Sequence, residues 1–158
     1  MISFKSVGQT VSNITTQQAA LAVKPLPVGI VTPLDLGDSD EGLLAMHYNV
    51  GDQMKNNLRD LLMTNWGERL GVYDYGGNLG PLVTEYENGK DAFDSACMQR
   101  IMYAVNKWMP YVTLESFDSN KVEFTNQIGL GAVVLLVDYS IPRAQIPKTR
   151  LQISFAVS

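Results

Sequence analysis

Two carboxylates with an enzyme-like spacing are the best candidates for chemistry in this chain. Glu85 and Asp94 are separated by eight residues, and a pair of carboxylates can act as acid and as base or nucleophile across a glycosidic bond. Asp94, however, falls in the first turns of a stretch with an ordinary amphipathic pattern. The other glutamates nearby and downstream, Glu87, Glu115 and Glu123, form no convincing pair. We therefore interpret the spacing as a chance match and predict that the chain has no catalytic residues.

The remaining reactive side chains also lack the neighbours that chemistry needs. Cys97 is the only cysteine and lies on an apolar helix face, so we predict a small buried hydrophobe rather than a nucleophile. His47 is the only histidine, and no spaced second ligand accompanies it. The acidic cluster in residues 35–41 lacks the spacing of a calcium loop, and the glycines follow no phosphate-binding pattern. The sequence predicts neither a metal site nor a cofactor.

Charge and hydropathy exclude two further classes of partner. The net charge is −4, and lysine and arginine are scattered singly, so we predict no binding to nucleic acid. The longest apolar run, residues 128–137, is about half the length that spans a bilayer, and no leader peptide is evident at the N-terminus. A single cysteine, which cannot form an internal disulfide, favours synthesis in the cytoplasm.

Two stretches have the periodicity of amphipathic helices. In Val50–Met63, the residues Val50, Met54, Leu58, Leu61 and Leu62 recur at helical spacing, and Asn49 or Asp52 is placed to cap the start. In residues 91–108 an apolar face is formed by Phe93, Cys97, Ile101, Ala104, Val105 and Trp108, with Gln99, Arg100, Asn106 and Lys107 outward. Pro110 then ends the helix.

The period changes to that of strands after Pro110. Residues 111–118 and a second run through Val122 and Phe124 alternate about a predicted turn at Asp118, Ser119 and Asn120. Residues 130–141 are dense in valine and leucine, and residues 149–157 alternate cleanly; residues 43–48 predict a short earlier strand. With 158 residues and 46% apolar composition, we expect one α+β domain in which two main helices pack on a largely antiparallel sheet.

Residues 1–28 differ from the rest and precede the predicted domain of residues 29–158. They are polar at first and then extended through Lys24, Pro25, Leu26 and Pro27. Two interpretations remain open: a disordered tail, or an arm that lies along a neighbouring subunit and orders on binding.

The loop between the two helices, residues 64–79, is rich in glycine and aromatic residues and resembles a shaped structural connection. Its order of Thr64, Gly67, Glu68, Arg69, Asp74, Tyr75 and Gly76 after a leucine-rich helix, with a second helix and strands following, resembles the baseplate wedge, or sheath-initiator, family of contractile phage tails and type VI secretion systems. This family is often labelled tail lysozyme-like. The resemblance covers roughly residues 29–155.

The resemblance implies a structural role in a virion baseplate. In the family, the second helix closes with Glu-Pro-Arg, a motif implicated in docking onto the wedge core, whereas here Met109, Pro110 and Tyr111 follow Trp108. We therefore expect docking through apolar contact by Trp108, Met109 and Tyr111. The family also implies that strands 130–141 and 149–157 offer an edge to the tail sheath protein, although both strands would be internal in an alternative arrangement.

The resemblance further implies particular residues and partners. The expected partners are the tail sheath protein, other baseplate wedge proteins, and tube or hub proteins. The expected sheath-contact residues are Leu151, Ile153, Phe155 and Val157. Arg69 is expected to brace loop carbonyls or a carboxylate such as Asp74, with partner binding as the rival role.

Two other functions stay open at this point. One is a virion-associated peptidoglycan hydrolase, although phage-type lysozymes follow the Glu and Asp spacing with a threonine five residues later, where this chain has Arg100. The other is a small cytoplasmic adaptor on the same fold.

Overall fold

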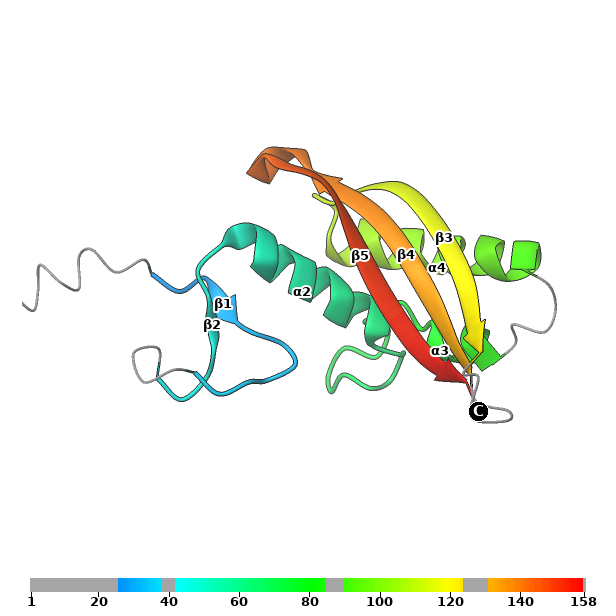
Figure 1. Ribbon diagram of the computed structural model, residues 1–158, viewed down its shortest axis with the longest axis horizontal. Helices are drawn as coiled ribbons and strands as arrows, with labels where there is room; N and C mark the ends of the chain where they lie inside the picture. The colour runs from blue at the N-terminus through cyan, green and yellow to red at the C-terminus, as the bar shows by residue number, and fades with distance from the viewer. Residues whose placement is uncertain (1–25, 38–41, 85–89, 124–130, 158) are drawn as a thin grey trace, which may run out of the picture.

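The computed structural model describes residues 26–37, 42–84, 90–123 and 131–157. In chain order the elements are β1 (Gly29–Ile30), β2 (Met46–His47), α2 (Val50–Met63), α3 (Gly80–Thr84), α4 (Lys90–Trp108), β3 (Thr113–Glu123), β4 (Gly131–Ile141), the 3-10 turn η2 (Pro142–Ala144) and β5 (Ile146–Val157). The chain is α+β with antiparallel sheets, which confirms the predicted fold class (Figure 1).

Helix α2 has the bounds that its apolar spacing predicts. The side chain of Asn49 caps it by accepting a hydrogen bond from the Gly51 N–H at 2.8 Å, which satisfies one of the free donors of the first turn. Leu58, Leu61 and Leu62 are fully buried, but Val50 is 46% exposed. The prediction that Val50 belongs to the apolar stripe was therefore wrong, because the first turn of α2 extends beyond the core.

Helix α4 buries the predicted face, and it ends before Pro110 as expected. The buried residues are Phe93, Cys97, Ile101, Ala104 and Val105. Arg100 was predicted to face outward, but its guanidinium donates to the Asn78 carbonyl at 2.9 Å and lies 5.1 Å from the Trp66 ring centroid. It therefore contacts the loop that joins α2 to α3.

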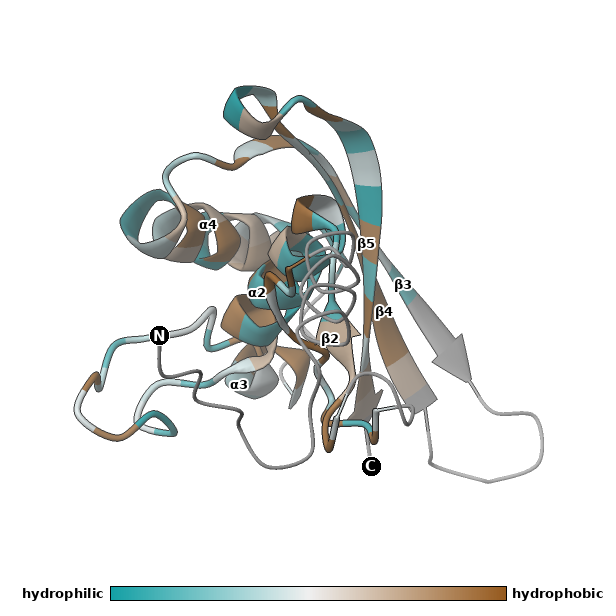
Figure 2. Cartoon of the chain, turned by 90° about the vertical axis from the view of Figure 1, so that its left-hand side faces the viewer, coloured by the Kyte–Doolittle hydropathy of each residue, from teal (hydrophilic) through white to brown (hydrophobic). Residues whose placement is uncertain are grey.

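The main sheet has the order β3-β4-β5, with every neighbouring pair antiparallel. Along β4 the side chains of Val133, Leu135, Val137, Tyr139 and Ile141 are buried, and this period of two places them on one face. Figure 2 shows α2, α3 and α4 on one side of this sheet. The core lies between these helices and the sheet, where burial of apolar surface stabilises the fold.

The predicted turn at Asp118, Ser119 and Asn120 was wrong. These residues continue β3 and pair with Leu136, Leu135 and Val134, respectively. Ser119 is fully buried and donates its hydroxyl to the Asp94 carboxylate of α4. A buried hydrogen bond and an unbroken ladder outweigh the turn preference of these three residue types.

Three smaller differences concern element bounds. Strand β2 is shorter than the predicted residues 43–48, β5 begins at Ile146 rather than at residue 149, and α3 was not predicted.

The predicted arm lies mostly outside the described residues, so the boundary at residue 28 stays a prediction. The described helices include none that is long and apolar enough to cross a membrane.

Candidate functional site

The loop of residues 64–79 is held by its own backbone and by the end of α2. The Gly67 N–H donates to the Tyr73 carbonyl at 2.7 Å, and the Gly77 N–H donates to the Leu61 carbonyl at 2.9 Å. Gly76 has φ +117°, and a Cβ there would lie 2.1 Å from the Thr64 carbonyl oxygen. Only glycine fits this approach of backbone to backbone, so the loop has one well-defined shape.

The charged residues of the loop are paired differently from the prediction. The Arg69 guanidinium lies 4.2 Å from the Tyr75 ring centroid, in a cation–π contact. Asp74 accepts a hydrogen bond from Lys107 of α4 instead of bracing Arg69. This contact lowers the pKa of Asp74 and raises the pKa of Lys107. The predicted Arg69 to Asp74 contact was wrong because α4 brings a lysine to the same carboxylate.

Glu68 closes the turn that leaves α2. Its carboxylate accepts from the Asn65 backbone N–H at 2.7 Å and from the Asn65 side chain at 2.9 Å. The backbone hydrogen bond is the main reason that the pKa of Glu68 is lowered. Glu68 is therefore a local structural brace.

The loop and the predicted docking segment, which are distant in sequence, line one pocket of about 680 Å³. We call it the loop–helix pocket. Its walls are formed by Asn57, Asp60, Thr64, Glu68, Arg69, Tyr75, Trp108, Met109 and Tyr111. The Tyr75 and Trp108 rings meet edge to face with centroids 5.3 Å apart. This contact is a favourable one for aromatic rings and holds the two side chains in place in the pocket wall.

Within this pocket the docking residues have different exposures. Met109 is buried in the core and Tyr111 is half-buried, and burial raises the pKa of the Tyr111 hydroxyl. Pro110 is exposed and borders a neighbouring hollow of about 420 Å³ instead. The expectation that Met109 offers a surface contact is therefore wrong, because its side chain packs inward from the end of α4.

Trp108 is partly buried, and its Nε1 atom lies out of contact with solvent without a hydrogen-bond partner among the described residues. A buried donor without an acceptor costs free energy. Sequence reasoning marked Trp108 for its apolar ring and had no signal for this donor.

Strand β5 carries the predicted sheath-contact residues, but their side chains point into the protein. Leu151 and Ile153 are buried and Phe155 is half-buried, while the side chain of Val157 lies outside the described residues. The outer edge of β5 has no neighbour among the described strands, because β5 pairs there only with β4. Strand β4 is central and paired on both sides, so the prediction that residues 130–141 offer an edge was wrong.

A charged cluster on the opposite face of the sheet was missed from the sequence. Asp138 accepts hydrogen bonds from Arg150 at 2.7 and 3.0 Å and from the Ser116 hydroxyl at 2.8 Å, and Lys148 lies 3.3 Å away. Arg150, followed by Ser116, lowers the pKa of Asp138 well below its ordinary value. The cluster joins β3, β4 and β5, and only the strand register brings its members together.

The residues considered for catalysis have structural environments where they are described. Glu85 lies outside the described residues, and Asp94 accepts the Ser119 hydroxyl as noted above. Cys97 is fully buried, and burial raises the pKa of its thiol to about 12. His47 Nε2 lies 2.7 Å from the Asn56 side chain. The described residues contain no group of three potential metal ligands.

Comparison with known proteins gives a match of fold. No protein-family model matches the chain, and no curated protein sequence matches it significantly. A chain of the cryo-EM structure of the anti-feeding prophage baseplate matches with a TM-score of 0.55 and 19% identity, over 75% of this chain and 86% of that one. The chain therefore shares its fold with a protein of that baseplate.

A second structure, a candidate tail lysozyme from Geobacter sulfurreducens, matches with a TM-score of 0.51 and 16% identity. This match covers 70% of the chain and 93% of the Geobacter protein. The resemblance predicted from the loop and the order of elements is thus confirmed at the level of the fold.

Proposed function

We propose that this protein is a structural component of the baseplate of a contractile injection system. The observation that carries the proposal is the fold shared with a chain of the anti-feeding prophage baseplate over most of both proteins. The loop of residues 64–79 supports it, because hydrogen bonds hold that loop in one shape and it lines the loop–helix pocket. The described residues of the loop form no catalytic group. In this role the protein is made in the host cytoplasm and ends in the assembled particle.

The more specific role is that of a wedge subunit with two contact regions. The loop–helix pocket docks onto the wedge core, with Tyr111 at its rim and Trp108 in its wall. Wedge proteins, and tube or hub proteins, are the partners for this region. A partner acceptor that reached Trp108 Nε1 would relieve its missing hydrogen bond.

The second contact region is the outer edge of β5. An edge strand presents free backbone N–H and C=O groups that can pair with a strand from another chain. We assign this edge to the tail sheath protein, so that the first sheath ring extends the order β3-β4-β5 by one strand. The protein acts by position and not as an enzyme.

The test of the sheath role uses two lysine variants that occupy equivalent places on opposite edges. Ser154 of β5 and Asn120 of β3 both pair with Val134 and both are exposed. Lysine on an edge strand opposes strand addition, so Ser154→Lys should weaken co-purification with the sheath subunit of the same genome by tenfold or more, whereas Asn120→Lys should not. Equal retention by both variants would refute the assignment to β5.

Point variants are preferable to removal of β5. Truncation after Gln145 would also delete Leu151 and Ile153 from the core, so lost binding would then report unfolding. Docking at the loop–helix pocket is tested separately with the Pro110 and Tyr111 double alanine variant and with Trp108→Phe, which keeps an aromatic ring and removes only the donor. If both variants still bind the wedge proteins, the loop–helix pocket is not the docking site.

A peptidoglycan hydrolase is the second candidate, and the similarity to the Geobacter candidate tail lysozyme favours it. Clearing of cell walls by the parent protein and its loss in Glu85→Gln would establish that function and overturn the structural role proposed above.

A further inference from the structure

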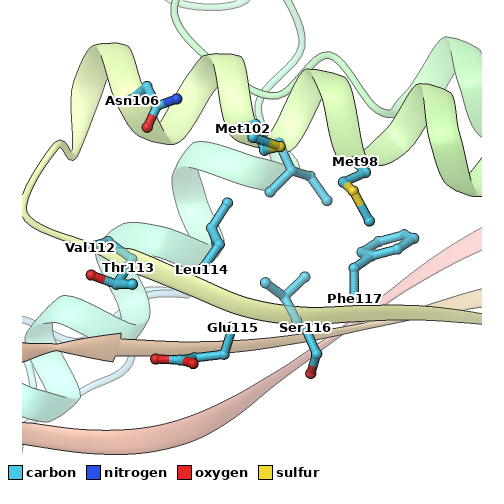
Figure 3. A pocket seen from close by; sticks show the side chains of 11 residues that line it. Met98, Met102, Asn106, Val112, Thr113, Leu114, Glu115, Ser116 and Phe117 are labelled. Atoms are coloured by element: carbon cyan, nitrogen blue, oxygen red, sulfur yellow. The ribbon is translucent and has the colours of Figure 1, made fainter.

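A second groove, unrelated to the loop–helix pocket, lies between α4 and the edge strand β3. We call it the β3–α4 groove; its volume is about 430 Å³. Met98 and Met102 line it from the helix, and Leu114 and Phe117 line it from the strand. Figure 3 shows the two strand side chains pointing toward the methionines, while Glu115 and Ser116 point away from the helix. The groove is therefore apolar on both walls.

Several features indicate that this groove accepts an extended segment. Met98 and Met102 are 44% and 47% exposed, and methionine adapts to varied apolar partners. Strand β3 pairs only with β4 among the described strands, so free backbone groups lie beside the groove. An added strand would pair with β3 and place alternate side chains between the methionines and Phe117.

The N-terminal residues 1–25 have the composition of such a segment. Residues 19–23 form a short apolar run, Ala-Ala-Leu-Ala-Val, in which Ala19, Leu21 and Val23 would share one face of a strand. These 25 residues contain Lys5 and Lys24 and no acidic residue, whereas the rest of the chain holds the other ten basic residues and all 16 acidic ones. Among the residues that line the groove, the one acidic side chain, Glu115, points to the other face of β3 and accepts a hydrogen bond from Ser140, so the groove itself favours an apolar segment such as residues 19–23.

Chain length decides whether the segment comes from the same copy. Leu21 is five residues before Leu26, where the described chain begins, and five residues span at most about 18 Å. Strand β1 begins three residues after Leu26, and β1 and β2 lie on the far side of α2 from the main sheet (Figure 1), so α2 lies between the start of the described chain and the sheet that carries β3. The segment would have to pass one helix, which is about 10–12 Å across, and then the spacing to the next helix, which is about 8–10 Å. Together these lengths are about 18–22 Å, against a reach of at most about 18 Å. Leu21 of the same copy therefore falls short.

We infer that the β3–α4 groove of one copy binds residues 19–23 of a second copy. The segment lies along β3 as an added strand, with Leu21 and Val23 between the helix and the strand. Because the segment and the groove are different surfaces, each copy can give a segment and receive one. It uses β3, and so it is independent of the sheath role assigned to β5.

The inference is tested with the full chain by light scattering after size-exclusion chromatography over a range of concentrations. The parent should associate with increasing concentration, and Leu21→Asp and Met102→Asp should each require at least tenfold higher concentration to do so. The controls are Ser12→Asp in the same N-terminal segment and Met63→Asp, which alters a methionine that is 39% exposed on α2. A parent that stays monomeric, or a control that weakens association as strongly, would overturn the inference.

An engineered disulfide tests the geometry. In the Leu21→Cys, Met102→Cys variant, oxidation should link two copies, because native Cys97 is buried and does not compete. A link within one copy would show that the chain fills its own groove, and no link would show that another partner does; either result refutes the exchange between copies.

Discussion

Gly76 is the position at which we expect a single added methyl group to damage the structure most. A side chain at positive φ costs about 1–2 kcal/mol, and a Cβ at this position would lie 2.1 Å from the Thr64 carbonyl oxygen. The Thr64 oxygen is a backbone atom and the position of a Cβ is fixed by its own backbone, so the loop itself must move. The movement would weaken the hydrogen bonds from Gly77 to Leu61 and from Trp66 Nε1 to Gly76, at about 1 kcal/mol each. Gly76→Ala should therefore lower the free energy of unfolding by about 3–4 kcal/mol.

Urea denaturation followed by tryptophan fluorescence measures this loss. With a slope of about 2 kcal/mol per molar urea, the midpoint should fall by about 2 M without a change in slope. Trp66 donates to Gly76 and Trp108 packs on Tyr75, so the native spectrum should change as well.

Gly71 supplies the matched control. It also has positive φ, at +81°, but a Cβ there would meet nothing within 4 Å. Gly71→Ala should lose only the backbone term of about 1–2 kcal/mol. Equal midpoints for the two variants would refute the reasoning, because the collision with Thr64 would then have no effect.

Three further predictions follow from burial and charge. Leu61→Ala should lower the free energy of unfolding by about 2–5 kcal/mol because Leu61 is fully buried, while Leu36→Ala, at an exposed position, should change it by less than about 0.5 kcal/mol; urea denaturation compares them. The lowered pKa of Asp138 means that its carboxylate stabilises the fold above the unfolded pKa of about 4 and that this contribution is lost as pH falls below it. The stability difference between the parent and Asp138→Asn should thus be constant from pH 7 to pH 5 and shrink by pH 3, and a difference that grows on acidification would contradict the assignment. Cys97, whose thiol pKa is raised to about 12, should not react with a thiol reagent at pH 8 until urea unfolds the protein, which absorbance of the released reagent would show.

The helices could be predicted from the sequence because their apolar residues recur along the chain itself. Leu58, Leu61 and Leu62 fix the buried side of α2 without any knowledge of what covers it. The short α3 could not be found in this way, since five residues give too little periodicity. The wrong turn at Ser119 shows the opposite case. Its residue type favours a turn, but its pairing with Leu135 and its hydrogen bond to Asp94 of α4 keep it in a strand, and neither contact can be read from the local sequence.

The candidate contact surfaces depend on tertiary structure to a greater degree. The sequence identified Arg69 and Trp108 separately, but it could not show that α2 and α4 bring them to one pocket. It identified two apolar strands, but the register alone decides that β4 is central and that β5 is an edge. Asp138 and Arg150 are twelve residues apart, and they meet only because their strands pair directly.

The long ladder between β4 and β5 has a mechanical consequence. Both strands exceed ten residues, and their pairing runs from Gly131 opposite Val157 to Ile141 opposite Ile146. Because the hydrogen bonds of an antiparallel pair are perpendicular to the strands, a pull along β5 loads them together in shear instead of opening them one at a time. The packed side chains of Leu151 and Ile153 would pass that load to the helices. A strand bound along β5 would thus be attached to a stiff coupling, which transmits displacement with little stretch.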